Sequence, residues 1–153
     1  MTKLPPFIIL ILFLISGCKP NNEGRNLAQV PSCIFGQSSC QLASKFGDIS
    51  PQFNQTFLVA ETPFELHINE LGNAVEISSA YMAGEDMFMG KIPLFFKPKA
   101  QGGWVAQSMF GSCAQAQMTW RVWLTLKAAD GEMQTLNFTV KSFRSLSAIP
   151  EGL

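Results

Sequence analysis

Residues 118–127 read MTWRVWLTLK, and this stretch decides the fold class. Every second side chain in it is large and apolar: Met118, Trp120, Val122, Leu124 and Leu126. Because successive side chains of a strand point to opposite faces, this alternation predicts a strand with one face on a core and the other in solvent. Trp120 is then expected in the core, and Trp123 on the outer face beside Arg121.

The same period of two, broken by turn residues, recurs along the chain. It predicts further strands at 57–61, 64–69, 74–79, 91–97, 104–109 and 134–143. Gly-containing pairs between them, such as Asp130-Gly131, favour tight turns. Short strands at this spacing predict an all-β fold, a single antiparallel β-sandwich of immunoglobulin-like shape with about seven strands. A small β-barrel is the alternative.

The charge balance excludes several classes of protein. The chain has 153 residues, 11 basic and 11 acidic side chains, no formal net charge, and 47% hydrophobic residues. Disordered tails combine low hydrophobicity with high net charge, and nucleic-acid binders present a basic face, so neither class fits. The single His excludes a site built from several histidines, and no acid–base pair is identifiable. We therefore expect a protein that is not an enzyme and has no nucleic-acid partner, and we identify no catalytic residue and no small-molecule substrate.

The N-terminus has the layout of an export signal. Lys3 precedes nine apolar residues at 7–15, which as a helix span only about 14 Å, too short for a membrane core of about 30 Å. The following Ile-Ser-Gly-Cys18 resembles a bacterial lipobox. That resemblance implies cleavage before Cys18 and acylation of this residue, so that the membrane is the first partner. If the source has two membranes, Lys19 in the next position resembles the sorting signal that favours the periplasmic face of the outer membrane. An uncleaved anchor is the alternative.

The expected organisation follows from these boundaries. Residues 1–17 form the signal peptide, 18–54 a lipidated Cys18 with a flexible tether and a cysteine loop, 55–145 the sandwich, and 146–153 a tail.

Three cysteines remain after Cys18. An exported chain permits disulfides, and Cys33 and Cys40 are close enough in sequence to close a small loop, which leaves Cys113 as a thiol. Pairing of Cys113 with Cys33 or Cys40 is the competing arrangement.

Two loops gather sulfur side chains. Residues 81–90 and 110–120 contain five candidate metal ligands, which are Met82, Met87, Met89, Cys113 and Met118. Thioethers and thiolates are soft donors. Among the metal ions that an exported protein meets, Cu(I) is the one that prefers such ligands. The sequence therefore predicts a Cu(I) site, with core packing of these methionines as the competing interpretation.

A Met-x-x-x-x-Met-x-Met-Gly loop, followed by a Cys and by Met-x-Trp before a strand, resembles small exported copper-handling domains. The FixH-like and YtkA-like proteins are the groups concerned. The resemblance covers roughly residues 60–145 and implies copper delivery or buffering for oxidase assembly. A structural or interaction lipoprotein that contacts another envelope protein is the alternative.

Overall fold

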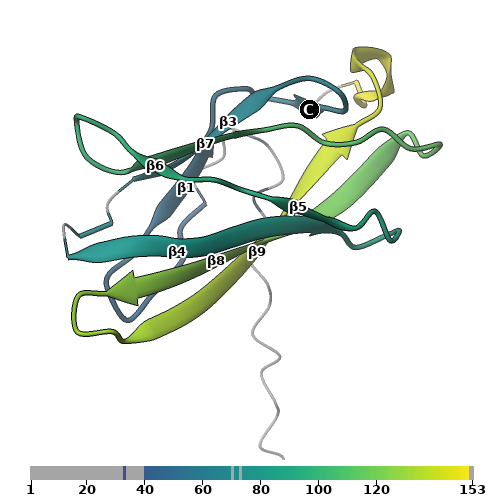
Figure 1. Cartoon of the computed structure of the whole chain (residues 1–153). Helices are drawn as coiled ribbons and strands as arrows, with labels where there is room; N and C mark the ends of the chain where they lie inside the picture. The colour runs from purple at the N-terminus through teal and green to yellow at the C-terminus, as the bar shows by residue number, and fades with distance from the viewer. Residues whose placement is uncertain (1–32, 34–39, 70, 73, 152–153) are drawn as a thin grey trace, which may run out of the picture.

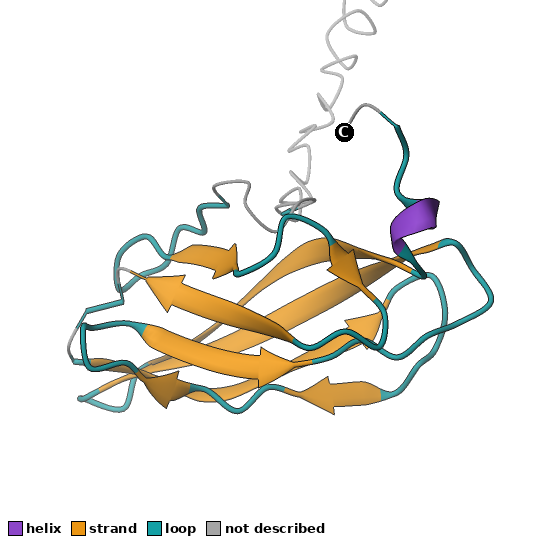
Figure 2. Ribbon diagram, turned by 90° about the horizontal axis from the view of Figure 1, so that it is seen from above, coloured by secondary structure: helices purple, strands orange, loops and turns teal. Residues whose placement is uncertain are grey.

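The computed structural model describes Cys33 and residues 40–69, 71–72 and 74–151, and places nine strands in two sheets (Figure 1). The four-stranded sheet has the order β1 (Ser50–Phe53), β3 (Phe64–Asn69), β7 (Trp104–Ser108) and β6 (Lys97–Pro98). The five-stranded sheet has the order β2 (Leu58–Val59), β9 (Met133–Phe143), β8 (Gln117–Ala128), β4 (Val75–Gly84) and β5 (Lys91–Pro93). The prediction of an all-β sandwich is confirmed. A short 3-10 helix, η2 (Leu146–Ala148), follows β9 (Figure 2).

The long hairpin of β8 and β9 forms the middle of the five-stranded sheet. The two strands pair antiparallel without interruption from Gln117 opposite Phe143 to Lys127 opposite Met133. Gly131 adopts φ 89° in the turn between them, a left-handed conformation that favours glycine. Strand β8 alternates as predicted, since its even-numbered residues from 118 to 126 are buried and the residues between them are partly exposed.

The strand predicted at 91–97 is divided between the two sheets. Residues 91–93 pair with β4, whereas Lys97 and Pro98 pair with β7 in the opposite sheet. Between them Leu94 is buried, and its N–H donates to the Ala80 carbonyl at 2.9 Å. Pro93 has no N–H for a continuing ladder, which is consistent with a break here. The segment from β5 to β6, which crosses from one sheet to the other, closes one side of the sandwich and gives it a partly barrel-like outline (Figure 1).

The opposite side is closed in the same way by the chain that runs from β1 to β2. Strand β1 pairs antiparallel with β3, and β2 then joins the other sheet as a parallel neighbour of β9. The first strand of the described residues thus begins at Ser50, whereas the sandwich was expected to begin at residue 55. Pro51 lies in β1, which among the described residues pairs with β3 alone, and an edge strand tolerates proline.

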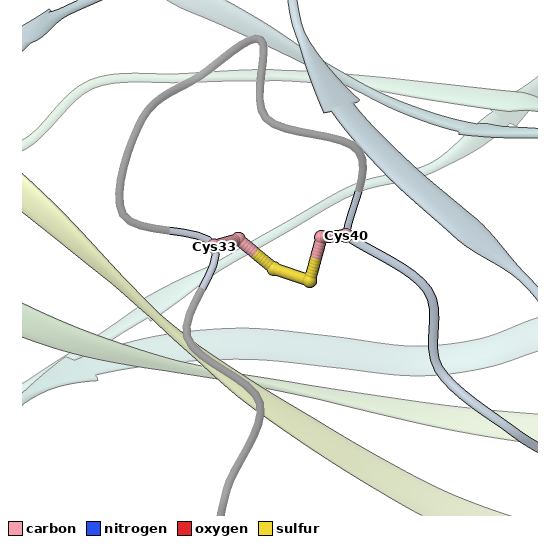
Figure 3. The surroundings of a disulfide bond; sticks show 2 residues. All are labelled: Cys33 and Cys40. Atoms are coloured by element: carbon pink, nitrogen blue, oxygen red, sulfur yellow. A yellow bond between two sulfur atoms is a disulfide. The ribbon is translucent and has the colours of Figure 1, made fainter.

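The segment before β1 also packs against the core. Cys33 and Cys40 form a disulfide with a Cα–Cα distance of 5.3 Å, as predicted, and both residues are buried (Figure 3). The Cys33 N–H donates to the Thr139 carbonyl of β9 at 2.8 Å, and Leu42 forms an isolated bridge with Ile49. Cys113 is a free, partly buried thiol.

Aromatic rings link the two sheets inside the sandwich. Phe64 of β3 stacks on Phe110, with ring centroids 4.7 Å apart, and Phe110 contacts the Trp120 ring at 4.9 Å. Trp120 is fully buried, as predicted, and its Nε1 donates to the Ser142 hydroxyl at 2.9 Å. Within the described part of the chain, no helix has the length and apolar character needed to cross a membrane.

Candidate metal centre

The two sulfur-bearing loops lie at the same end of the sandwich (Figure 1). The cause is the antiparallel pairing of β4 with β8, in which the last residue of β4, Gly84, is opposite Trp120 near the start of β8. The loop that leaves β4 therefore begins beside the loop that enters β8. The first loop contains Met87 and Met89, and the second contains Cys113.

The first loop is held against β8 by two adjacent acidic residues. The Glu85 carboxylate accepts two hydrogen bonds from the Arg121 guanidinium, at 2.5 and 3.0 Å, and the Glu85 N–H donates to the Thr119 carbonyl at 2.9 Å. The Asp86 carboxylate accepts from the Thr119 N–H at 2.6 Å. These bonds continue the β4–β8 ladder past its end, and they fix where the following methionines emerge.

Met89 and Met118 approach one another at Gly84. A Cβ atom placed on Gly84 would lie 3.2 Å from Met118 Cε and 3.5 Å from Met89 Cγ. A Cβ atom on Gly111, two residues before Cys113, would lie 3.6 Å from Met89 Cε. The half-buried Met89 side chain therefore extends from one loop toward the other, with the Met118 methyl beside it.

Cys113 and Met118 line one small cavity of about 10 Å³ together with Ala60, Gly111, Gln115, Ser142 and Arg144. A cavity of this size has room for about one water molecule. Arg144 frames the same cavity and donates from Nη1 to the Ala114 carbonyl at 3.2 Å. The Cys113 thiol contacts the Gln115 carbonyl at 3.9 Å. Met89, Cys113 and Met118, which we call the sulfur cluster, are thus gathered from two loops and one strand.

Of the other two predicted ligands, Met82 lies in the core and Met87 lies on the surface of the first loop. Met82 is 1% exposed and points into the core, where it is paired with Ile92 and Val122. Val122 is four residues from Met118 along β8, a separation of about 13 Å. Met87 is 39% exposed on the loop surface.

Sequence patterns missed the residues that organise the sulfur cluster. Gly84, Asp86 and Arg121 carry no metal-binding signature, and their roles depend on the register of β4 against β8. Among the described residues, no group of three or more His, Cys, Asp or Glu side chains is arranged to hold a metal ion.

Replacing Gly84 by alanine is expected to displace the first loop. The new Cβ would lie 2.5 Å from the Met87 carbonyl oxygen, a backbone atom that cannot rotate away, so the loop must move. Overpacking of this kind lowers the free energy of unfolding by about 1–3 kcal/mol. Urea denaturation measures the loss, and the methyl resonances of Met89 and Met118 should shift in NMR spectra.

The matched control is Gly72→Ala, because a Cβ at Gly72 meets no atom within 4 Å. An equal loss of stability in the two variants would contradict the close approach at Gly84.

Comparisons with known proteins give only distant likenesses. No protein-family model matches the chain, and no curated protein matches it. Among solved structures, the chain is similar to a copper-bound variant of FetP from uropathogenic Escherichia coli strain F11, with a TM-score of 0.44 and 8% identity over 77% of this chain and 98% of the other. An engineered protein is similar with a TM-score of 0.34 and 12% identity over 60% of this chain and 20% of the other.

Proposed function

We propose that this chain is an exported protein that binds Cu(I) through Met89, Cys113 and Met118. The observation that carries the proposal is the arrangement of three sulfur side chains, in which Met89 and Met118 both lie beside Gly84 and Met118 and Cys113 line one small cavity. Cu(I) favours soft thioether and thiolate ligands and accepts low coordination numbers, so three such donors suffice. Met87, exposed on the same loop, is a candidate fourth sulfur on the solvent side.

The setting of the sulfur cluster suits a carrier that releases its metal. Met89 and Cys113 are only partly buried, so an incoming ligand has access to them, while Met118 is held in the core. The bonds from Glu85 and Asp86 to β8 position the first loop in advance of binding. Delivery or buffering of copper, including delivery for oxidase assembly, fits this combination better than catalysis does.

The proposed location depends on the N-terminal sequence, which lies outside the described residues. Acylation of Cys18 would anchor the protein, and the outer membrane is the favoured destination, with the domain on its periplasmic face.

A Cu(I) competition titration tests the proposal. The full-length chain, kept in detergent with ascorbate so that the disulfide stays intact, is titrated against a chromophoric Cu(I) chelator. We expect it to withdraw one equivalent of copper. Met118→Leu, Met89→Leu and Cys113→Ser should each weaken Cu(I) binding at least about tenfold, or about 1.4 kcal/mol, while the fold is retained.

Met133→Leu is the matched control, because Met133 is 60% exposed at the far end of β9 and should leave the Cu(I) affinity unchanged. No withdrawal of copper by the wild-type chain would refute the proposal.

A protein-interaction role is the second candidate, and one observation favours it. Phe88 is 93% exposed at the tip of a loop that is otherwise held firmly to β8. An exposed aromatic on a fixed loop is typical of a contact with another protein, here an envelope protein. This role alone predicts that the chain withdraws no copper in the titration described above.

A further inference from the structure

A second group of ligand-type side chains lies on the other sheet. Strand β3 directs Phe64, Leu66 and Ile68 into the core, which leaves Glu65 and His67 together on the outer face. His67 is the only histidine in the chain. Both side chains are partly open to solvent, His67 at 26% and Glu65 at 36% exposure.

The two side chains already have the spacing of two ligands on one ion. His67 Nε2 lies 3.1 Å from Glu65 Oε2. Zinc–nitrogen and zinc–oxygen bonds are about 2.0–2.2 Å long, and bond angles between 90° and 109° then separate the two donor atoms by about 2.9–3.4 Å. A metal ion could replace the shared proton with little movement of either side chain.

The carboxylate is also oriented by a neighbour on the next strand. Gln107, opposite Glu65 on β7, donates from Nε2 to Glu65 Oε1 at 3.1 Å, which leaves Oε2 for His67. A residue that hydrogen-bonds to a metal ligand, as Gln107 does to Glu65, raises metal affinity by holding the ligand in one orientation.

We propose that Glu65 and His67 bind a divalent transition-metal ion, Zn²⁺ or Cu²⁺, on the outer face of the four-stranded sheet. Imidazole nitrogen and carboxylate oxygen suit these ions, whereas the sulfur cluster suits Cu(I). Water completes the coordination, since these two residues are exposed and no third His, Cys, Asp or Glu joins them among the residues the structure describes. The site is therefore expected to bind in the micromolar range or weaker.

The open side of the site limits where the ion can lie. Glu65 and Gln107 border a hollow of about 390 Å³ with Phe95, Lys97 and Val105. Lys97 lies in the same row across the sheet as Val105 and His67. The positive charge of Lys97, which borders the hollow, repels a metal ion there. The ion is therefore expected between Glu65 and His67 rather than in the hollow.

Zn²⁺ titration followed by NMR tests the site directly. Since the chain has one histidine, its imidazole protons form one resolvable pair of signals, and a purification tag containing histidine must be absent. We expect these signals in the full-length chain to shift and saturate at one equivalent. Glu65→Gln should weaken the binding at least about tenfold, and Gln107→Leu by a smaller factor.

The matched control is Glu76→Gln, because Glu76 pairs with Lys127 at 3.3 Å on the other sheet and should leave the titration unchanged. In a parallel experiment with Cu²⁺, His67→Asn should abolish the hyperfine signal of one coordinated nitrogen. An unshifted imidazole at millimolar Zn²⁺, or equal Zn²⁺ affinity in Glu65→Gln and wild type, would overturn the proposal. The outcome is independent of the Cu(I) titration, because the imidazole signals report only on His67.

Discussion

Replacing Trp120 by alanine is expected to lower the free energy of unfolding by about 3–5 kcal/mol. The Trp120 side chain is fully buried, contacts Phe110 at 4.9 Å between ring centroids, and donates to the Ser142 hydroxyl. Alanine would leave a large cavity between the sheets and would remove the hydrogen-bond partner of a buried hydroxyl. Because domains of this size are stable by about 5–15 kcal/mol, urea denaturation should show a much lower midpoint.

Trp123 provides the matched control on the same strand. It lies on the outer face, stacked on Tyr81 at 4.8 Å and partly exposed, so Trp123→Ala should cause a clearly smaller loss, on the order of 1 kcal/mol. Trp120→Phe should lie between the two, because it keeps most of the volume and loses the indole N–H. Equal losses for Trp120→Ala and Trp123→Ala would show that the central packing of the sandwich does not depend on Trp120.

Replacing both Cys33 and Cys40 by alanine is expected to lower the free energy of unfolding by about 2–3 kcal/mol. The disulfide closes a loop with a sequence separation of seven, so its removal enlarges the ensemble of unfolded conformations. Both residues are also packed against the core beside β9, and the smaller side chains would leave a gap there. Urea denaturation of the oxidised wild type and of the double variant measures the difference.

Two comparisons separate the disulfide from side-chain effects. A mild reductant should destabilise the wild type by a similar amount and leave the double variant unchanged. Cys113→Ala should have a smaller effect, since Cys113 is a partly buried free thiol. If the double variant and the oxidised wild type unfold at the same urea concentration, the loop does not stabilise the folded state.

The alternation of side chains was sufficient to predict the strands that are buried on one face. The stretch 118–127 and residues 64–69 alternate cleanly, and both form strands with the predicted inward face. Short edge segments were predicted less well. Ser50–Phe53 was not recognised, and the strand at 91–97 proved to be two, because a partner in the opposite sheet determines where an edge strand pairs.

In the candidate sites, too, residue types could be predicted from the sequence, whereas the positions of the side chains relative to one another could not. Residue types alone identified sulfur donors in two loops, but the pairing of Gly84 with Trp120 determines that Met89 and Met118 meet beside Gly84. Met82 was indistinguishable from Met89 in the sequence, yet the register places it in the core beside Val122.

Local periodicity and residue chemistry are enough to identify the all-β class, the inward face of the main strands and the kinds of ligand available. The way the edges close, the meeting of particular sulfur side chains, and the connected group of Glu65, His67 and Gln107 emerge only from the fold. The physical reason is that these arrangements depend on strand register and on crossings between sheets, which bring together residues as far apart in the chain as Glu65 and Gln107.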